Sequence, residues 1–322
     1  MVKSLHPANV PTSGLLTQTE TGIIKTLLYF DIFDYPLTIT ELIGYHPEKV
    51  EDDLSFQMVL DKLVADGLIS CSGLFYGIQN SEELVVKRLE YNHRAAAYIQ
   101  KAIRTTRIIS RFPFVEMVAL SGSLSKNAAG PDSDIDYFVI AKPGRVWVTR
   151  FLLTIYKKTI LLNQSKYFCA NLIMASDRLS FSDHSRYIAT EIVSLLPLFG
   201  LEKYRKFLAQ NSWTQTIFPN AVSRETEIVL ADKKQSPVAR VAEWLLDGWL
   251  GNNLDAWWQE VIRKKWHKDH AERRHVMQNP TDYIDIQPHI MKGHGGDQYP
   301  RIRQAFQTRI ATFEHQFGIV IS

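Results

Sequence analysis

The chain has 322 residues, of which 45% are hydrophobic and 22% are charged. This length and composition exclude a wholly disordered protein and predict about two or three domains, each with its own core. The formal net charge of +3 is too small to require nucleic acid or an anionic membrane as a partner. The two cysteines, Cys71 and Cys169, form no C-x-x-C motif, which argues against a disulfide framework and a cysteine-based zinc site.

The N-terminal segment, residues 1–19, is predicted to be a flexible tail. It is polar, contains Pro7, Pro11 and Gly14, and lacks the apolar core of a signal peptide. No uninterrupted apolar run approaches the ~20 residues that a transmembrane helix needs. These features, together with the sparse cysteines, predict a cytoplasmic protein without membrane contact.

Residues 20–80 have the pattern of a winged helix-turn-helix domain. Apolar residues recur at helical spacing until Pro36 ends the first helix, and Gly67 provides a C-terminal cap for the third. Two short apolar runs around Gly73 then predict a hairpin. The expected elements are helices near residues 21–34, 38–44 and 50–65 and strands at residues 68–70 and 74–77.

The third of these helices, which would enter the major groove of DNA, has an acidic surface. Residues 48–66 contain six acidic residues against only Lys49 and Lys62. Phosphates repel such a surface, which argues against duplex DNA as a partner. Residues 20–80 are therefore predicted to be a packing module or a module that contacts another protein.

Three further regions complete the predicted α+β fold, which has a small mixed sheet at its centre. Residues 81–112 are expected to form one long helix that links the winged-helix domain to the central domain. The central domain, residues 113–180, is expected to contain strands at 114–120, 134–141 and 166–175 and a helix at 146–162. The mainly helical C-terminal region, residues 181–322, is expected to contain helices at 182–198, 201–212 and 238–266.

The last of these helices is rich in tryptophan. Tryptophan at helical spacing usually belongs to a core or an interface, and less often to a surface that stacks on bases. We therefore expect a core or interface role for Trp244, Trp249, Trp257, Trp258 and Trp266.

Residues 121–140 carry the strongest chemical signal in the sequence. A strand ends at a Gly-Ser pair, a polar loop follows, and the next strand opens with Asp134 and Asp136. Side chains two positions apart in a strand lie on the same face, so both carboxylates can hold hard divalent cations. Two such cations suit an in-line displacement at phosphorus, because they stabilise both the attacking and the leaving oxygen.

The turn before these aspartates suits a triphosphate. Gly122 has no side chain, so phosphates can approach the backbone closely. Ser123 and exposed amides can donate hydrogen bonds to phosphate oxygens, and Lys126 can add a positive charge.

This arrangement resembles the signature of the polymerase beta-like nucleotidyltransferase superfamily, in which a Gly-Ser turn precedes a metal-binding Asp-x-Asp. The resemblance covers residues 114–175 directly. It implies catalytic and metal-binding roles for Asp134 and Asp136, and nucleotide binding by Gly122 and Ser123.

A narrower resemblance extends beyond the third expected strand. It is to a group of bacterial nucleotidyltransferase-like proteins with an N-terminal winged helix, whose members continue with a helical segment. It rests on the segments Phe168-Cys169-Ala170-Asn171-Leu172, Ala189-Thr190-Glu191, Leu196-Pro197-Leu198, Asn211-Ser212-Trp213 and Phe218-Pro219-Asn220.

One feature of the superfamily is missing. Its members commonly carry a third carboxylate on a following strand, where it activates the attacking hydroxyl, but the strand expected at residues 166–175 has no acid before Asp177. Asn171 lies near the expected position, and an amide cannot act as a base at neutral pH. Either Asp177 or a more distant acid serves, or the acceptor needs little activation, or the protein binds nucleotide without efficient transfer.

These features predict transfer of a nucleoside monophosphate from a nucleoside triphosphate, expected to be ATP, to an acceptor. Asp134 and Asp136 would hold Mg²⁺ or Mn²⁺, and pyrophosphate would leave. Three acceptor classes fit: a protein side chain, a small alcohol such as an aminoglycoside, or an RNA end. The alternative is a catalytically weak or inactive nucleotide-binding regulatory protein that acts through its winged helix.

Overall fold

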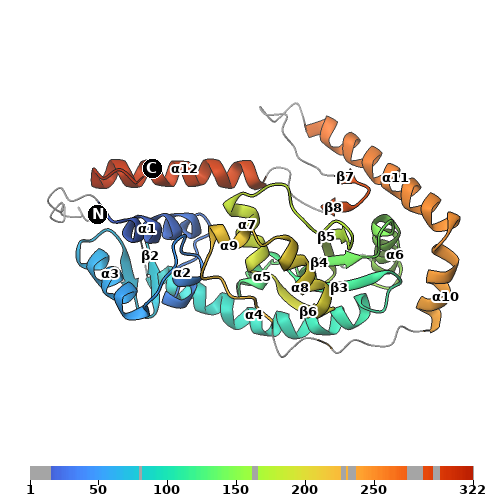
Figure 1. Cartoon of the computed structure of the whole chain (residues 1–322), viewed down its shortest axis with the longest axis horizontal. Helices are drawn as coiled ribbons and strands as arrows, with labels where there is room; N and C mark the ends of the chain where they lie inside the picture. Colours follow the sequence, from blue (N-terminus) through green and yellow to red (C-terminus); the bar gives the residue numbers. More distant parts are fainter. Residues whose placement is uncertain are drawn as a thin grey trace. The chain divides into compact units, whose positions relative to one another are not determined.

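The computed structural model describes residues 16–79, 82–161, 166–225, 230, 237–273, 286–292 and 298–321 (Figure 1). The expected flexible tail lies outside the described residues as far as residue 15, and the first helix already begins at Gln18. The fold class is α+β with a small mixed sheet, as predicted.

The chain divides into two compact units. The first unit consists of Met1–Glu90, Trp213–Val222 and Tyr299–Ser322, and the second consists of Tyr91–Ser212 and Ser223–Gln298. The predicted C-terminal region, residues 181–322, is therefore not a single domain, because its residues belong to both units. The long helix α4 (Glu82–Ile109) also contributes residues to both.

The first unit has three helices followed by a hairpin, in the predicted order. The elements are α1 (Gln18–Asp31), α2 (Ile39–Gly44), α3 (Asp53–Ala65), β1 (Ser70–Ser72) and β2 (Phe75–Gly77). Capping boxes start the first two helices, because Thr17 with Glu20 and Thr38 with Glu41 exchange side-chain and backbone hydrogen bonds. Residues 214–217 (α9, Thr214–Ile217) and most of α12 (Gln298–Phe317) complete the unit.

The core of the first unit joins the two ends of the sequence. Phe313 of α12 and Ile321 are buried in one apolar cluster with Ile23 and Leu27 of α1 and Leu60 of α3. The end of the chain therefore stabilises the N-terminal helices by removing apolar surface from water.

The second unit is built on a sheet whose described strands have the order β6-β3-β4-β5-β8-β7. Their bounds are β3 (Val115–Leu120), β4 (Asp136–Ala141), β5 (Cys169–Ala175), β6 (Leu196–Phe199), β7 (Ile286–Gln287) and β8 (Ile290–Lys292). β4 and β5 run parallel and are connected through α6 (Val146–Thr159), whereas the other described neighbours pair antiparallel.

The outer strands of this sheet differ from the sequence prediction. The helix expected at residues 182–198 is shorter, α7 (Arg186–Val193), and its end is replaced by strand β6. Pro197 cannot donate a ladder hydrogen bond, which suits β6 because that strand lies at an edge of the sheet. Strands β7 and β8 were not predicted, since two or three residues carry too little periodicity to be recognised.

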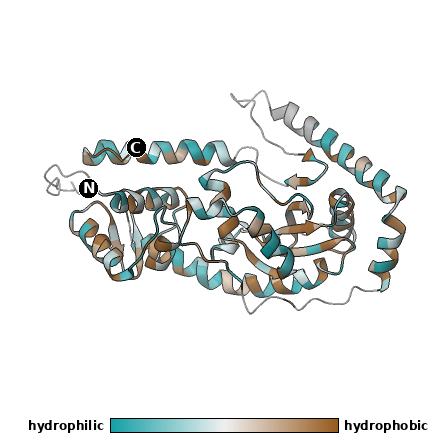
Figure 2. Cartoon of the chain, in the orientation of Figure 1, coloured by the Kyte–Doolittle hydropathy of each residue, from teal (hydrophilic) through white to brown (hydrophobic). Residues whose placement is uncertain are grey.

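The alternation of side chains along β4 separates the two faces of the sheet. Tyr137 and Val139 are buried with Trp147 of α6 in the main apolar cluster of the unit. Phe138 points to the opposite face and meets Phe207 of α8 (Leu201–Gln210), with ring centroids 5.0 Å apart. The central strands are coloured as hydrophobic in Figure 2, as expected for a sheet covered on both faces. Asp136 shares the face of Phe138.

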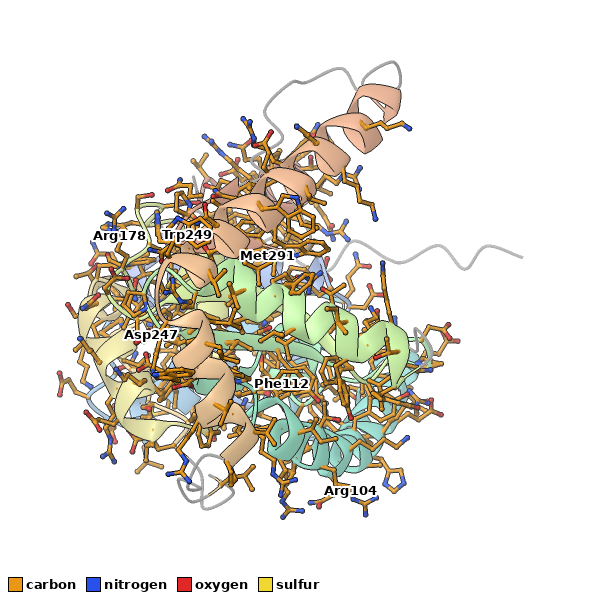
Figure 3. The ribbon with its side chains drawn as sticks, turned by 90° about the vertical axis from the view of Figure 1, so that its right-hand side faces the viewer. Arg104, Phe112, Arg178, Asp247, Trp249 and Met291 are labelled. Carbon is orange, nitrogen blue, oxygen red and sulfur yellow. The ribbon has the colours of Figure 1, made fainter. Side chains whose placement is uncertain are left out.

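Two helices near the C-terminal part of the second unit carry the tryptophans. In α10 (Pro237–Leu246) Trp244 is 78% exposed. Trp249, labelled in Figure 3, lies at the start of α11 (Trp249–Arg273) and is 75% exposed. Neither side chain lies in the core, and a role in an interface stays a prediction. Trp258 packs on Phe151 of α6, where α11 lies against that helix. The side chain of Trp266 lies outside the described residues.

A helix that crosses a bilayer must be both long and predominantly apolar. Within the described residues, no helix combines these two properties.

Candidate active site

The predicted Gly-Ser turn joins the end of β3 to the short helix α5 (Gly122–Ser125). The Ser121 amide donates to the Asp136 carbonyl oxygen at 3.0 Å, which continues the pairing of β3 with β4 into the turn. Gly122 has φ +67°, and a Cβ atom there would lie 2.9 Å from Oδ2 of Asp136. The turn therefore requires glycine for two reasons, its left-handed backbone and its close approach to the aspartate.

Asp134 and Asp136 flank the fully buried Ile135, where the chain enters β4. The strand begins at Asp136, not at the predicted residue 134. Extended pairing nevertheless continues one residue further, because the Ile135 amide donates to the Lys166 carbonyl at 2.8 Å and the Cys169 amide donates to the Ile135 carbonyl. Side chains alternate along an extended chain, so the two aspartates lie on the side opposite Ile135. Asp134 is exposed and Asp136 is half-buried.

Cys169 lies beside Asp136, because these two residues pair between β4 and β5. Burial raises the pKa of the Cys169 thiol to about 11, and the negative charge of Asp136, which accepts a hydrogen bond from the thiol, acts in the same direction. The Cys169 side chain is therefore protonated at neutral pH.

Lys126 follows α5 and is held in place by two acceptors. Its Nζ atom donates to the Gly122 carbonyl at 3.1 Å and to Oε1 of Glu191 in α7 at 2.8 Å. Only 15% of the Lys126 side chain is exposed. Arg224 adds a second positive charge near this turn by donating to the Ser125 carbonyl oxygen. The Lys126 ammonium thus lies beside the Gly-Ser turn and is paired with Glu191, and its phosphate-binding role stays a prediction.

Asn171 occupies a bulge in β5. Tyr137 pairs with Ala170 and Phe138 pairs with Leu172, which leaves Asn171 as the extra residue between them. The bulge lies in the strand next to Asp136, near the position along β5 at which a third carboxylate was expected.

Asp177 does not lie near the other two aspartates. It follows Ala175, which pairs with Ala141 at the far end of β4, whereas Asp136 pairs with Cys169 at the near end. Six residues of strand separate the two ends, which corresponds to about 20 Å at ~3.3 Å per residue. The alternative in which Asp177 replaces the third carboxylate is therefore wrong.

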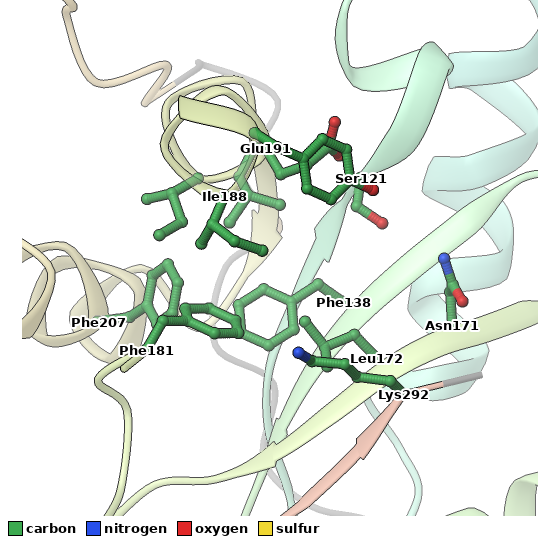
Figure 4. A pocket seen from close by; sticks show the side chains of 12 residues that line it. Ser121, Phe138, Asn171, Leu172, Phe181, Ile188, Glu191, Phe207 and Lys292 are labelled. Carbon is green, nitrogen blue, oxygen red and sulfur yellow. The ribbon is translucent and has the colours of Figure 1, made fainter. Parts of the chain in front are cut away.

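A cavity of about 120 Å³ adjoins these residues on the Phe138 face of the sheet (Figure 4). Its floor contains the rings of Phe138, Phe181 and Phe207, and its polar margin includes Ser121, Asn171, Glu191 and Lys292. Figure 4 shows Glu191 beside Ser121 at one end and Lys292 of β8 at the other.

Sequence reasoning did not assign a role to three charged residues of this region, Glu191, Arg224 and Lys292. Glu191 lies in the segment Ala189-Thr190-Glu191, one of those on which the narrower resemblance rests. That resemblance is the signal in the sequence that points to Glu191. Arg224 and Lys292 reach the site through tertiary contacts from distant segments, and a single sequence contains no trace of such contacts.

The two aspartates fit the metal ion expected from the sequence if that ion binds together with a nucleotide. Within the described residues, no three His, Cys, Asp or Glu side chains gather to form a metal site. Mg²⁺ that binds with a nucleotide commonly uses one or two carboxylates, while phosphates and water supply the remaining oxygens. Asp134 and Asp136 match that donor set.

Comparison with known proteins identifies the segment that contains this geometry. Residues 104–188 match the family model described as a nucleotidyltransferase domain. The match spans β3, the Gly-Ser turn, both aspartates, β5 and the first residues of α7. Searches of curated proteins and of solved structures each found no match. This match supports the resemblance of residues 104–188 to the polymerase beta-like nucleotidyltransferase superfamily.

Proposed function

We propose that the protein transfers a nucleoside monophosphate from a nucleoside triphosphate, with ATP as the first candidate, to an acceptor hydroxyl. The observation that supports this proposal is the apposition of the Gly122 turn and Asp136, where a Cβ atom on Gly122 would lie 2.9 Å from Oδ2. A bare backbone turn beside a carboxylate allows phosphates and a carboxylate-bound cation to meet in one place.

Each residue near the turn has a distinct proposed role. Mg²⁺ or Mn²⁺ bound by Asp134 and Asp136 supplies positive charge to the reacting phosphates. Ser123 and the first amides of α5, which have no partner within the helix, donate to phosphate oxygens. Lys126 adds a positive charge when it turns from Glu191 to a phosphate. The acceptor oxygen forms a bond to the α-phosphorus, and the bond from that phosphorus to pyrophosphate breaks.

Isothermal titration tests the binding part of this proposal. ATP, GTP, CTP and UTP are titrated with Mg²⁺ into the wild type, the Asp134→Ala/Asp136→Ala double variant and the control Asp177→Ala. Asp177 is an exposed aspartate at the far end of β5, so its loss changes net charge without touching the site.

We expect the double variant to lose Mg²⁺-dependent binding and Asp177→Ala to retain it. Intact-mass measurement of the wild type after incubation with ATP then detects self-modification, which points to a protein acceptor. Equal nucleotide binding by the wild type and the double variant would show that the site is assigned to the wrong residues.

A second candidate is a nucleotide-binding regulatory protein that acts through its first unit. Two observations favour it: the amide Asn171 lies where a carboxylate was expected, and Leu54 and Met58 of α3 are 75% and 72% exposed. Exposed apolar side chains among acidic ones suit a protein partner better than DNA. ATP binding without turnover, accompanied by changed hydrogen exchange in α3, would favour this function over transfer.

A further inference from the structure

We infer that the cavity beside Asp136 holds the acceptor, that this acceptor is an alcohol with one ring-sized apolar group and an anionic group, and that Glu191 takes the proton from its hydroxyl. This inference rests on the proposed function and specifies its acceptor class and its base. The size of the cavity, the charges at its two ends and the position of Glu191 support it.

The size and lining of the cavity suit a single ring. Its volume is about 120 Å³. An apolar protein cavity of ~150 Å³ is known to bind benzene, so this cavity matches a ring or a slightly smaller group. Phe207 meets Phe138 edge to face at 5.0 Å and Phe181 at 6.2 Å between ring centroids. A ring inserted here would meet aromatic edges and faces, which favours planar or cyclic apolar groups.

The charges at the two ends of the cavity differ in sign. Glu191 lies at the end nearest Ser121, and Lys292 lies at the opposite end (Figure 4). The Lys292 ammonium lies 5.6 Å from the centroid of the Phe181 ring, so it faces the aromatic floor. An acceptor that fits both ends carries its hydroxyl towards Glu191 and an anionic group towards Lys292.

Glu191 is close enough to the Gly-Ser turn to act on a hydroxyl that attacks there. Its Oε1 atom is 2.8 Å from Lys126 Nζ, which is itself 3.1 Å from the carbonyl oxygen of Gly122. This position suits proton transfer from a hydroxyl that attacks at the turn.

The chemical step is balanced without a further reactant. The acceptor hydroxyl loses its proton to the Glu191 carboxylate while its oxygen forms a bond to the α-phosphorus. The bond from the α-phosphorus to the bridging oxygen breaks, and pyrophosphate leaves with that electron pair. Glu191 then supplies the function that Asn171 on β5 cannot supply.

The ion pair with Lys126 couples this base to nucleotide binding. A triphosphate at the Gly122 turn competes with Glu191 for the Lys126 ammonium. When Lys126 turns to a phosphate, the Glu191 carboxylate becomes available to the acceptor hydroxyl. The base is thus engaged by Lys126 until the nucleotide arrives.

The first arm of the test measures binding of two probes, 4-(hydroxymethyl)benzoate and benzyl alcohol, which differ in the anionic group. Titration followed by ligand-observed NMR is carried out on the wild type and Lys292→Gln. We expect the wild type to bind the benzoate at least about tenfold more tightly, as a charge-assisted hydrogen bond implies, and Lys292→Gln to lose that preference. No binding of either probe, or a preference unchanged by Lys292→Gln, would overturn the inference.

The second arm measures transfer from Mg·ATP to 4-(hydroxymethyl)benzoate by the wild type, Glu191→Gln and the control Glu202→Gln. Glu202 is an exposed glutamate of α8. For Glu191→Gln we expect kcat at least about 100-fold lower, and ATP affinity equal or tighter because Lys126 loses its anionic competitor. Retained ATP binding also shows that the variant is folded.

The outcomes separate this inference from the proposed function. If Mg·ATP binds through Asp134 and Asp136 but Glu191→Gln retains the wild-type rate, only the inference is overturned. If Lys292→Gln weakens ATP binding and leaves probe binding unchanged, the cavity holds part of the nucleotide and the inference is again overturned. If the wild type binds no Mg·ATP, the proposed function and the inference fail together.

Discussion

At the scale of single residues, Gly122 combines two constraints that can be separated by experiment. Gly122→Ala would place a Cβ atom 2.9 Å from Oδ2 of Asp136 in a backbone with φ +67°. Gly144 has a similar φ of +65° but nothing within 4 Å of its Cβ position. Both alanine variants should lose about 1–2 kcal/mol of stability through the left-handed backbone, but only Gly122→Ala should displace Asp136.

Nucleotide titration and thermal melting distinguish these effects. We expect Gly122→Ala to weaken Mg·ATP binding at least about tenfold and Gly144→Ala to bind as the wild type does. Equal losses in both variants would mean that backbone strain, and not the contact with Asp136, determines the effect.

Cys169 reports on Asp136 from the neighbouring strand. Because burial and the Asp136 charge raise the pKa of its thiol to about 11, Cys169 carries very little thiolate at pH 8. In EDTA-containing buffer, iodoacetamide should modify the exposed Cys71 first and modify Cys169 roughly 100-fold more slowly than a thiol of ordinary pKa.

Asp136→Asn should then accelerate the modification of Cys169, because it removes the negative charge that disfavours the thiolate. Peptide mass spectrometry over time measures both cysteines in one sample. A Cys169 rate that is insensitive to Asp136→Asn would contradict the placement of the thiol beside the carboxylate.

The parts of the site that could be predicted are those encoded in one short stretch of sequence. The Gly-Ser turn and the two aspartates lie 11 residues apart, from Ser123 to Asp134, on consecutive strands, so local pattern was sufficient to bring them together. Glu191 and Lys292 line the same cavity only because α7 lies beside the sheet there and β8 pairs with β5. Their approach depends on packing that periodicity does not encode.

At the scale of elements, the start of α6 shows how the C-terminal helices are fixed to the second unit. Arg145 at its N-cap provides no side-chain cap. Asp255 of α11 supplies it instead, because its Oδ1 accepts the Trp147 and Val148 amides at 2.9 and 2.8 Å. Two N–H groups of the first turn are thereby satisfied by another helix.

This cap predicts a specific dependence of stability on pH. Burial raises the pKa of Asp255 to about 6 from 3.8, although both backbone amides oppose the shift. Because the pKa of Asp255 is higher in the folded state than in the unfolded state, protonation of Asp255 stabilises the fold. This stabilisation is complete below about pH 4 and is lost as the pH rises through 6. The shift corresponds to roughly 3 kcal/mol, at ~1.4 kcal/mol per pKa unit.

Denaturant unfolding at several pH values measures this effect. Relative to the wild type, Asp255→Asn should gain stability between pH 4 and 6 because the amide does not titrate. Asp255→Ala should lose about 1–2 kcal/mol at pH 7 because two helix amides lose their acceptor. Parallel curves for the wild type and Asp255→Asn across this range would contradict the assigned titration.

The elements that sequence predicted well were those with long, consistent patterns. The apolar run before Gly122 and the alternating residues after Asp136 are strands β3 and β4, and the amphipathic stretch after Gly144 is α6. The expected helix over residues 182–198 failed at its end, where Leu196-Pro197-Leu198 adds an edge strand to β3. A short apolar run is compatible with either a helix or a strand. Here the run forms a strand, because it pairs with β3.

At the scale of the whole molecule, the division into two units predicts that damage to one core stays local. Phe313 is 2% exposed in the cluster of the first unit and packs on Phe317 at 4.6 Å. Phe313→Ala should cost about 3–5 kcal/mol, the usual range for a large buried aromatic side chain. The nearby Val320 is 78% exposed, so Val320→Ala serves as a control that should cost much less.

Hydrogen exchange followed by mass spectrometry locates the effect. We expect Phe313→Ala to increase exchange in α1 and α3, whose residues share the cluster with Phe313, and to leave β4 and β5 as protected as in the wild type. Mg·ATP affinity should then be unchanged, since the Gly122 turn and both aspartates belong to the second unit. Uniform loss of protection in both units would instead mean that they unfold as one cooperative body, and the N-terminal helices would then stabilise the nucleotidyltransferase domain directly.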